Sequence, residues 1–174
     1  MLTLGYFCSL KKVPMDVRIR PATKNDAAAI LALIQELALF EKEPQAVVLT
    51  QADIEAHGFG PQPLFQCLVA EAEAQVLGMA LFYPRYSTWK GPTLHLEDLI
   101  VKEAHKGKGI GTALYRAFIA HAYESGVNRI EWVVLDWNQP AVQFYKNSGA
   151  AVLDEWDTVQ MDRETMKNYL KQKK

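Results

Sequence analysis

The sequence predicts a mixed α/β fold (the α+β type, with a mixed sheet) in a single domain, and three observations support this prediction. Segments with apolar residues at helical spacing are interleaved with apolar and β-branched runs of strand length. The chain has 174 residues, of which 49% are hydrophobic and 22% charged, a composition that suits one domain with a sizeable core. It contains no internal repeat and no low-complexity stretch.

Composition also limits the partners and the compartment. The formal net charge of −1 gives no global attraction to nucleic acid or an acidic membrane, and no apolar run is long enough to span a bilayer. Cys8 and Cys67 form no disulfide framework, which favours the cytoplasm. Residues 1–14 are expected to be a disordered leader before a domain at 15–174, because Lys11 and Lys12 follow the apolar stretch, whereas a secretory signal has the reverse order.

The expected elements follow from local patterns. Capping boxes at Thr23/Asp26 and Thr50/Asp53 mark two helix starts, Gly58 marks a stop, and proline favours the first turn of a helix after Asn138. We expect helices at residues 23–40, 50–58, 110–123 and 138–149, and from 163. We expect strands at residues 17–20, 65–71, 76–86, 93–101 and 129–136, and near 151–153 and 156–161, with 65–71 and 76–86 paired as an antiparallel hairpin.

The central stretch joins a strand at 93–101 to a helix from Ile110 through the loop Lys106-Gly-Lys-Gly-Ile-Gly111. Glycines let a ligand approach the backbone, and the unpaired N–H groups at a helix start attract anions such as phosphates. The residue pattern of this loop matches neither the Walker loop nor the dinucleotide fingerprint. Tight packing remains the alternative explanation for this loop.

Two motifs resemble those of one enzyme superfamily. Lys106-x-x-Gly109-x-Gly111 is similar to the pyrophosphate loop R/Q-x-x-G-x-G/A of the GCN5-related N-acetyltransferases (GNAT), with Lys in place of Arg or Gln. The segment from Asn138 to Gly149, with its Phe-Tyr pair, resembles the second coenzyme A motif of that superfamily. The resemblance covers about residues 17–165 and implies the GNAT fold with acetyl-CoA as co-substrate and no metal. The cofactor residues that it implies are Leu99, Ile100, Val101, Gly107, Lys108, Gly109, Ile110, Gly111, Thr112, Asn138, Gln139, Pro140, Ala141, Tyr145 and Lys146.

Within the superfamily, the chain resembles the diamine (spermidine/spermine) acetyltransferases, and "FEKE", "YSTWKG" and "LDWNQ" are most similar to the thialysine N-ε-acetyltransferase branch. This resemblance implies a homodimer and a small amine substrate. The substrate-binding residues that we predict are Phe40, Glu41, Trp89, Glu97 and Asp98.

Two side chains are candidates for proton transfer. Tyr145 could protonate the departing thiolate, since a phenol with a pKa near ~10 keeps its proton at neutral pH. Glu97 could accept the proton of the amine through water, and strand alternation predicts that Glu97 and Asp98 point to opposite faces. The alternatives are that Tyr145 only packs its ring, that one of the two acids is structural, that Asn138 is a simple helix cap and that Trp89 anchors a hairpin tip. His95 is expected to be a cross-strand packing partner.

The predicted function is therefore transfer of an acetyl group from acetyl-CoA to a primary amine. A zwitterionic, lysine-like amine is favoured over a polyamine, because Arg85 and Lys90 lie close together in the sequence and could pair with a substrate carboxylate. The alternatives are a polyamine acetyltransferase, a protein-modifying acetyltransferase and a non-catalytic domain that binds acyl-CoA for regulation.

Overall fold

The computed structural model describes residues 16–171, so the expected leader at 1–14 lies outside the described part. Contacts along the chain divide it into two compact units, with the boundary between Val133 and Val134. The first unit contains the sheet, and the second contains the last two helices. The predicted mixed α/β class is confirmed, while the domain bounds 15–174 stay a prediction.

The sheet of the first unit is mixed and has the strand order β1-β2-β3-β4-β5. The first four strands pair antiparallel to their neighbours, and β5 pairs parallel to β4. The strands are β1 (Arg18–Pro21), β2 (Gln66–Ala72), β3 (Gln75–Ser87), β4 (Gly91–Val101) and β5 (Ile130–Glu131). The predicted hairpin is the β2–β3 pair.

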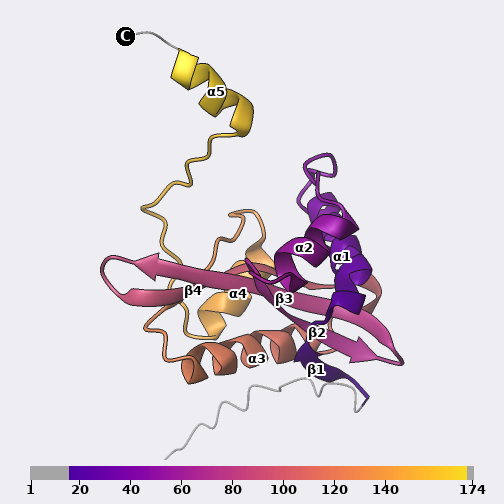
Figure 1. Cartoon of the computed structure of the whole chain (residues 1–174). Coiled ribbons are helices and arrows are strands. Elements are labelled where there is room, and N and C mark those ends of the chain that lie inside the picture. The colour runs from indigo at the N-terminus through magenta and orange to yellow at the C-terminus, as the bar shows by residue number, and fades with distance from the viewer. Residues whose placement is uncertain (1–15, 172–174) are drawn as a thin grey trace, which may run out of the picture. The chain divides into compact units, whose positions relative to one another are not determined.

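The helices of the first unit are α1 (Ala27–Phe40), α2 (Gln51–Phe59) and α3 (Ile110–Glu124). Both predicted capping boxes are present, although a 3-10 turn (Lys24–Asp26) precedes α1, and α2 ends at Phe59 rather than at Gly58. In Figure 1, α1 and α2 lie over one face of the sheet and α3 over the other. Phe82 of β3 packs on Phe118 of α3, with their ring centroids 5.1 Å apart.

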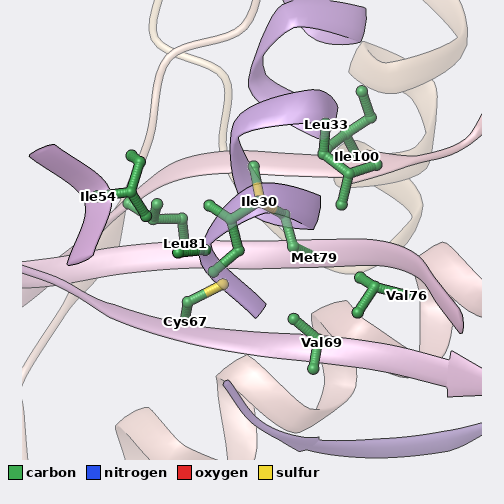
Figure 2. Packing of buried hydrophobic residues seen from close by; sticks show 10 residues of the cluster. Ile30, Leu33, Ile54, Cys67, Val69, Val76, Met79, Leu81 and Ile100 are labelled. Carbon is green, nitrogen blue, oxygen red and sulfur yellow. The ribbon is translucent and has the colours of Figure 1, made fainter. Parts of the chain in front are cut away.

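The core on the α1/α2 face is a cluster of buried apolar side chains that come from both helices and from strands β2 to β4 (Figure 2). Ile30 and Leu33 of α1 are fully buried, as is Met79 of β3. Burying such a side chain contributes about 1.5–3 kcal/mol. This packing fixes the C-terminal half of α1 above β3 and β4, where the candidate site lies.

Three strand predictions toward the end of the chain are wrong in whole or in part. The strand expected at 129–136 is confined to Ile130–Glu131, and no strand forms at 151–153 or 156–161. A strand needs a neighbour for its backbone hydrogen bonds, and an apolar alternating sequence does not supply one. The second unit instead contains α4 (Gln139–Asn147) and α5 (Arg163–Lys171), as predicted for its helices. None of the helices in the described chain is both long and apolar enough to cross a membrane.

Candidate active site

Strand β4 contains a bulge at Glu97. Asp98 pairs with Leu81 and Leu96 pairs with Phe82, so Glu97 is an extra residue with no partner position on β3. A bulge places two residues of one strand opposite one residue of its neighbour and interrupts the alternation of side chains. The prediction that Glu97 and Asp98 point to opposite faces is therefore wrong, since both line the same cavity.

This cavity, of about 370 Å³, lies where the end of α1 and the loop that follows it meet β3 and β4. Its carboxylates are Glu41, Glu43, Glu97 and Asp98. The other lining residues are apolar: Ile34, Leu37, Ala38, Ala46, Val47, Val48, Leu49, Ile54, Phe65 and Leu81. No lysine or arginine of the described chain lines it. An apolar cavity with several acidic groups suits a cationic ligand, because a buried ammonium needs a carboxylate partner.

Two of these carboxyl groups, Asp98 and Glu41, have raised pKa values. Burial raises the pKa of Asp98 to about 7, with further contributions from Glu97 and Glu41. Burial also raises the pKa of Glu41. A group with a strongly shifted pKa in a cavity is a candidate functional residue. A bound ammonium would offset the repulsion among these carboxylates and favour their ionised forms.

The Glu97 carboxylate lies at the cavity and has two side chains, Tyr83 and His95, close to it. The Tyr83 hydroxyl hydrogen-bonds the Glu97 carboxylate, and His95 Nε2 lies 3.7 Å from Glu97 Oε2. Its side chain is 51% exposed, so it can exchange protons with water. His95 stacks on its cross-strand partner Tyr83, with ring centroids 5.2 Å apart, which confirms the predicted packing role.

The glycine loop leads from β4 into α3. Gly107 and Gly109 have φ values of +74° and +84°, in the left-handed region that favours glycine, and Gly109 is the residue before the first turn of α3. Gly111 lies inside the helix, and a Cβ added there would meet only Val101 Cγ2, at 3.6 Å. The fold therefore does not require glycine at this position, and the missing side chain leaves space beside the helix start.

Two predicted substrate residues lie elsewhere in the first unit. The ring of Phe40 contacts Lys106, whose Nζ is 4.9 Å from the ring centroid and 2.6 Å from Glu103 Oε2. Trp89 is 77% exposed in the turn between β3 and β4. Neither is among the cavity-lining residues, and their roles toward substrate stay predictions.

In the second unit, Asn138 caps α4 by accepting a hydrogen bond from the Ala141 N–H at 3.3 Å. The predicted cap is thus present, and Pro140 lies in the first turn. Tyr145 is 9% exposed, and its ring packs against Phe144 with centroids 5.4 Å apart. Packing and a catalytic role for Tyr145 are compatible, because only its hydroxyl is needed for proton transfer.

A sequence model of the Acetyltransferase (GNAT) family matches residues 29–150, which is most of the chain. The chain belongs to this family. A thialysine N-epsilon-acetyltransferase of Bos taurus is 39% identical over 162 residues, covering 87% of this chain and 95% of that protein. Spermidine/spermine N(1)-acetyltransferase-like protein 1 of Homo sapiens is 35% identical over 168 residues, covering 90% of this chain and 24% of that protein. An integron cassette protein from the mobile metagenome of V. cholerae shares the fold, with a TM-score of 0.74 at 22% identity over 91% of this chain and 100% of that one.

GNAT enzymes use acetyl-CoA as co-substrate, and the first unit has features that fit it. The strand ladder between β4 and β5 covers only Leu94 and His95. Across residues 16–171, the same edge of β4 from Leu96 to Val101 therefore has no strand partner, which leaves backbone groups for an extended amide-containing chain. Next to it, a Cβ added to Gly107 would meet nothing within 4 Å. No group of three or more potential metal ligands occurs in the described part.

Two residues of the site were not among the predicted site residues. Glu43 lines the cavity but was not assigned to the substrate site, and Tyr83 was not considered. The Glu-Lys-Glu spacing of residues 41–43 could have indicated Glu43, since both acids follow the same helix end. The position of Tyr83 beside Glu97 depends on the register of β3 against β4, which the local sequence pattern does not determine.

Proposed function

We propose that this GNAT enzyme transfers the acetyl group of acetyl-CoA to the primary amine of a small molecule, with a lysine-like amine such as thialysine favoured. The observation that carries the proposal is the acidic cavity at the β4 bulge. It offers four carboxylates to an ammonium group directly beside the strand edge that suits the cofactor.

The cofactor proposal combines that strand edge with the two resemblance motifs. Leu99, Ile100 and Val101 would pair with the pantetheine arm, and the loop from Gly107 to Thr112 would donate backbone hydrogen bonds to the pyrophosphate. The resemblance assigns Asn138, Gln139, Pro140, Ala141, Tyr145 and Lys146 to the same cofactor. Lys106 departs from the Arg or Gln of the family and cannot reproduce the fork of an arginine.

Gly111→Ala tests the cofactor site without disturbing the fold. Because a Cβ at Gly111 would make only an ordinary van der Waals contact with Val101, alanine should leave the melting temperature unchanged or raise it, since alanine favours a helix over glycine by about 1 kcal/mol. Coenzyme A affinity, measured by calorimetry, should fall about 10-fold as the methyl group blocks the close approach of the backbone. Arg116→Ala, on an exposed position of α3, serves as the control with unchanged affinity. Equal affinities for parent and Gly111→Ala would contradict this placement of the cofactor.

The proposed chemistry needs three proton transfers. Glu97 first takes a proton of the ammonium through water, and the neutral amine nitrogen attacks the thioester carbonyl, so that a C–N bond forms and the C–S bond breaks. Tyr145 gives its proton to the departing thiolate, and the second proton that the nitrogen loses on becoming an amide returns to the Tyr145 phenolate. The backbone of β4 polarises the carbonyl by hydrogen bonding, as expected for a donor aimed at developing negative charge.

The structure changes the argument for the substrate. Arg85 forms an ion pair with Glu131, which also pairs with Arg129 NH2 at 2.8 Å, and Arg85 does not line the acidic cavity. Arg85 is thus engaged within the sheet, so the preference for a zwitterion rests on the curated relatives and on Lys90. The second candidate is a polyamine, favoured by four carboxylates and the lack of a described cation in the lining.

The deciding experiment measures kcat/KM for thialysine and for spermidine with labelled acetyl-CoA. We expect the higher value for thialysine. A higher value for spermidine would establish the polyamine alternative. Lys90→Ala serves as the diagnostic variant: if selectivity for thialysine survives it, the substrate class stands but Lys90 is not its cause. Binding of acetyl-CoA with no turnover of any amine would support the non-catalytic alternative and overturn the enzymatic proposal.

The resemblance also supports two wider proposals. A homodimer would allow the substrate pocket to draw on Phe40, Glu41 and nearby residues of a subunit. A cytoplasmic location rests on the cysteine usage of the sequence.

A further inference from the structure

Glu97, which lines the acidic cavity, belongs to a small polar cluster. It consists of Tyr83, His95 and Glu97, brought together by the β3–β4 pairing and the bulge. The two rings stack with an interplanar angle of 29°. Glu97 lines the cavity, whereas Tyr83 and His95 do not. The cluster therefore reaches substrate only through the Glu97 carboxylate.

The side chain of His95 is 12% exposed, and its Nδ1 is buried without a hydrogen-bond partner among the residues that the structure describes. Leaving a buried polar atom unpaired is unfavourable, and packing alone would be served by a phenyl ring. The one polar atom of this ring that has a neighbour is Nε2, at 3.7 Å from the Glu97 carboxylate. This geometry directs the hydrogen-bonding capacity of His95 to Glu97.

We propose that His95 is a positioning residue for Glu97: neutral His95 donates its Nε2–H toward the carboxylate and, with the Tyr83 hydroxyl, holds this general base so that it faces the amine. The inference rests on the proposed function and adds a specific residue to it. The gap of 3.7 Å closes by a small side-chain movement, as catalytic hydrogen bonds do when substrate binds.

The surroundings of the ring keep it neutral at neutral pH. Burial lowers the pKa of His95. The charges of Glu97 and Glu131 oppose this effect, whereas the charge of Arg85 adds to it. Burial and the hydrogen bond to Glu97 raise the pKa of Tyr83 to about 12, so its hydroxyl remains a donor. Neutral donors fix the carboxylate without placing a full positive charge beside it. When acid protonates His95, that charge lowers the basicity of Glu97 and slows proton removal.

The experiment compares His95→Phe, His95→Gln, Glu97→Gln and the double variant His95→Phe/Glu97→Gln, with kcat measured at saturating amine across pH. His95→Phe keeps the ring stack and removes the donor, so kcat should fall about 10–100-fold, the penalty for a misplaced catalytic group, with KM for the amine unchanged. His95→Gln keeps a donor and should recover much of the rate, but its acid limb should shift to lower pH. His57→Phe, on α2 outside the cavity, is the control with unchanged kinetics.

The double variant separates positioning from a purely structural role. If His95 acts through Glu97, adding His95→Phe to Glu97→Gln should cause little further loss. Additive losses, or a pH profile of His95→Gln that matches the parent, would overturn the inference, and so would a normal rate in folded His95→Phe. Failure of the parent enzyme to acetylate any amine would instead refute the proposed function, so the two failures are distinguishable.

Discussion

Asp98→Asn should make the protein more stable and a poorer enzyme. Burial and two acidic neighbours disfavour the ionised form of Asp98 in the folded state, where its pKa is about 7. An amide carries no charge and avoids this penalty, which is on the order of 2–4 kcal/mol at pH 8. The same change removes a carboxylate from the amine cavity, and KM for the amine should rise about 10-fold.

The contribution of Asp98 to folding stability changes with pH in a defined direction. The folded-state pKa of Asp98 lies above the unfolded value of 3.8, so its contribution to stability is fully present below pH 3.8 and is lost as the pH rises to about 7. The stability difference between Asp98→Asn and the parent should therefore grow over this interval and level off above it. Urea unfolding at several pH values measures this difference.

Asp53→Asn is the matched control for this prediction. Hydrogen bonds from Thr50 lower the pKa of Asp53, so the substitution should destabilise the protein, and its effect should disappear as acid protonates the parent carboxylate. A stability difference for Asp98→Asn that does not vary with pH would contradict the buried, charge-coupled state of Asp98. Unchanged amine kinetics would remove Asp98 from the substrate site.

Tyr145→Phe should reduce kcat by about 10²–10⁴, the range for loss of a general acid. The substitution keeps the ring that packs against Phe144 and removes only the hydroxyl. Coenzyme A affinity should change little in comparison with the rate. Single-turnover acetyl transfer measures the chemical step, and a thiol of lower pKa as the leaving group should restore part of the rate.

The control for this variant is Tyr123→Phe, whose parent side chain is 85% exposed on α3. It should behave as the parent does. A normal single-turnover rate in Tyr145→Phe would show that the leaving thiolate takes its proton from water or from another side chain. In that case, Tyr145 serves packing alone.

Local sequence alone predicted the features that depend on near neighbours. The capping boxes at Thr23 and Thr50 formed because an N-cap and the acid three residues later contact each other in any helix start. The β2–β3 hairpin and the start of α3 after Gly109 followed from turn residues and periodicity in the same way.

Only the tertiary structure decided which side chains share the cavity. A bulge depends on how β4 is registered against β3, and it placed Glu97 and Asp98 together where alternation predicted opposite faces. Likewise, Arg85 forms an ion pair with Glu131 of another strand, whereas the sequence suggested that Arg85 could pair with a substrate carboxylate.

One physical cause separates the features that the local sequence predicted from those that only the tertiary structure decided. Hydrogen bonds and periodic contacts within a few residues are determined by the local sequence, so it specified the helices, the hairpin and the glycine loop. Register, burial and charge coupling arise between segments far apart in the chain. Asp98 shows this, because its raised pKa depends on burial and on Glu41, which lies on a different element.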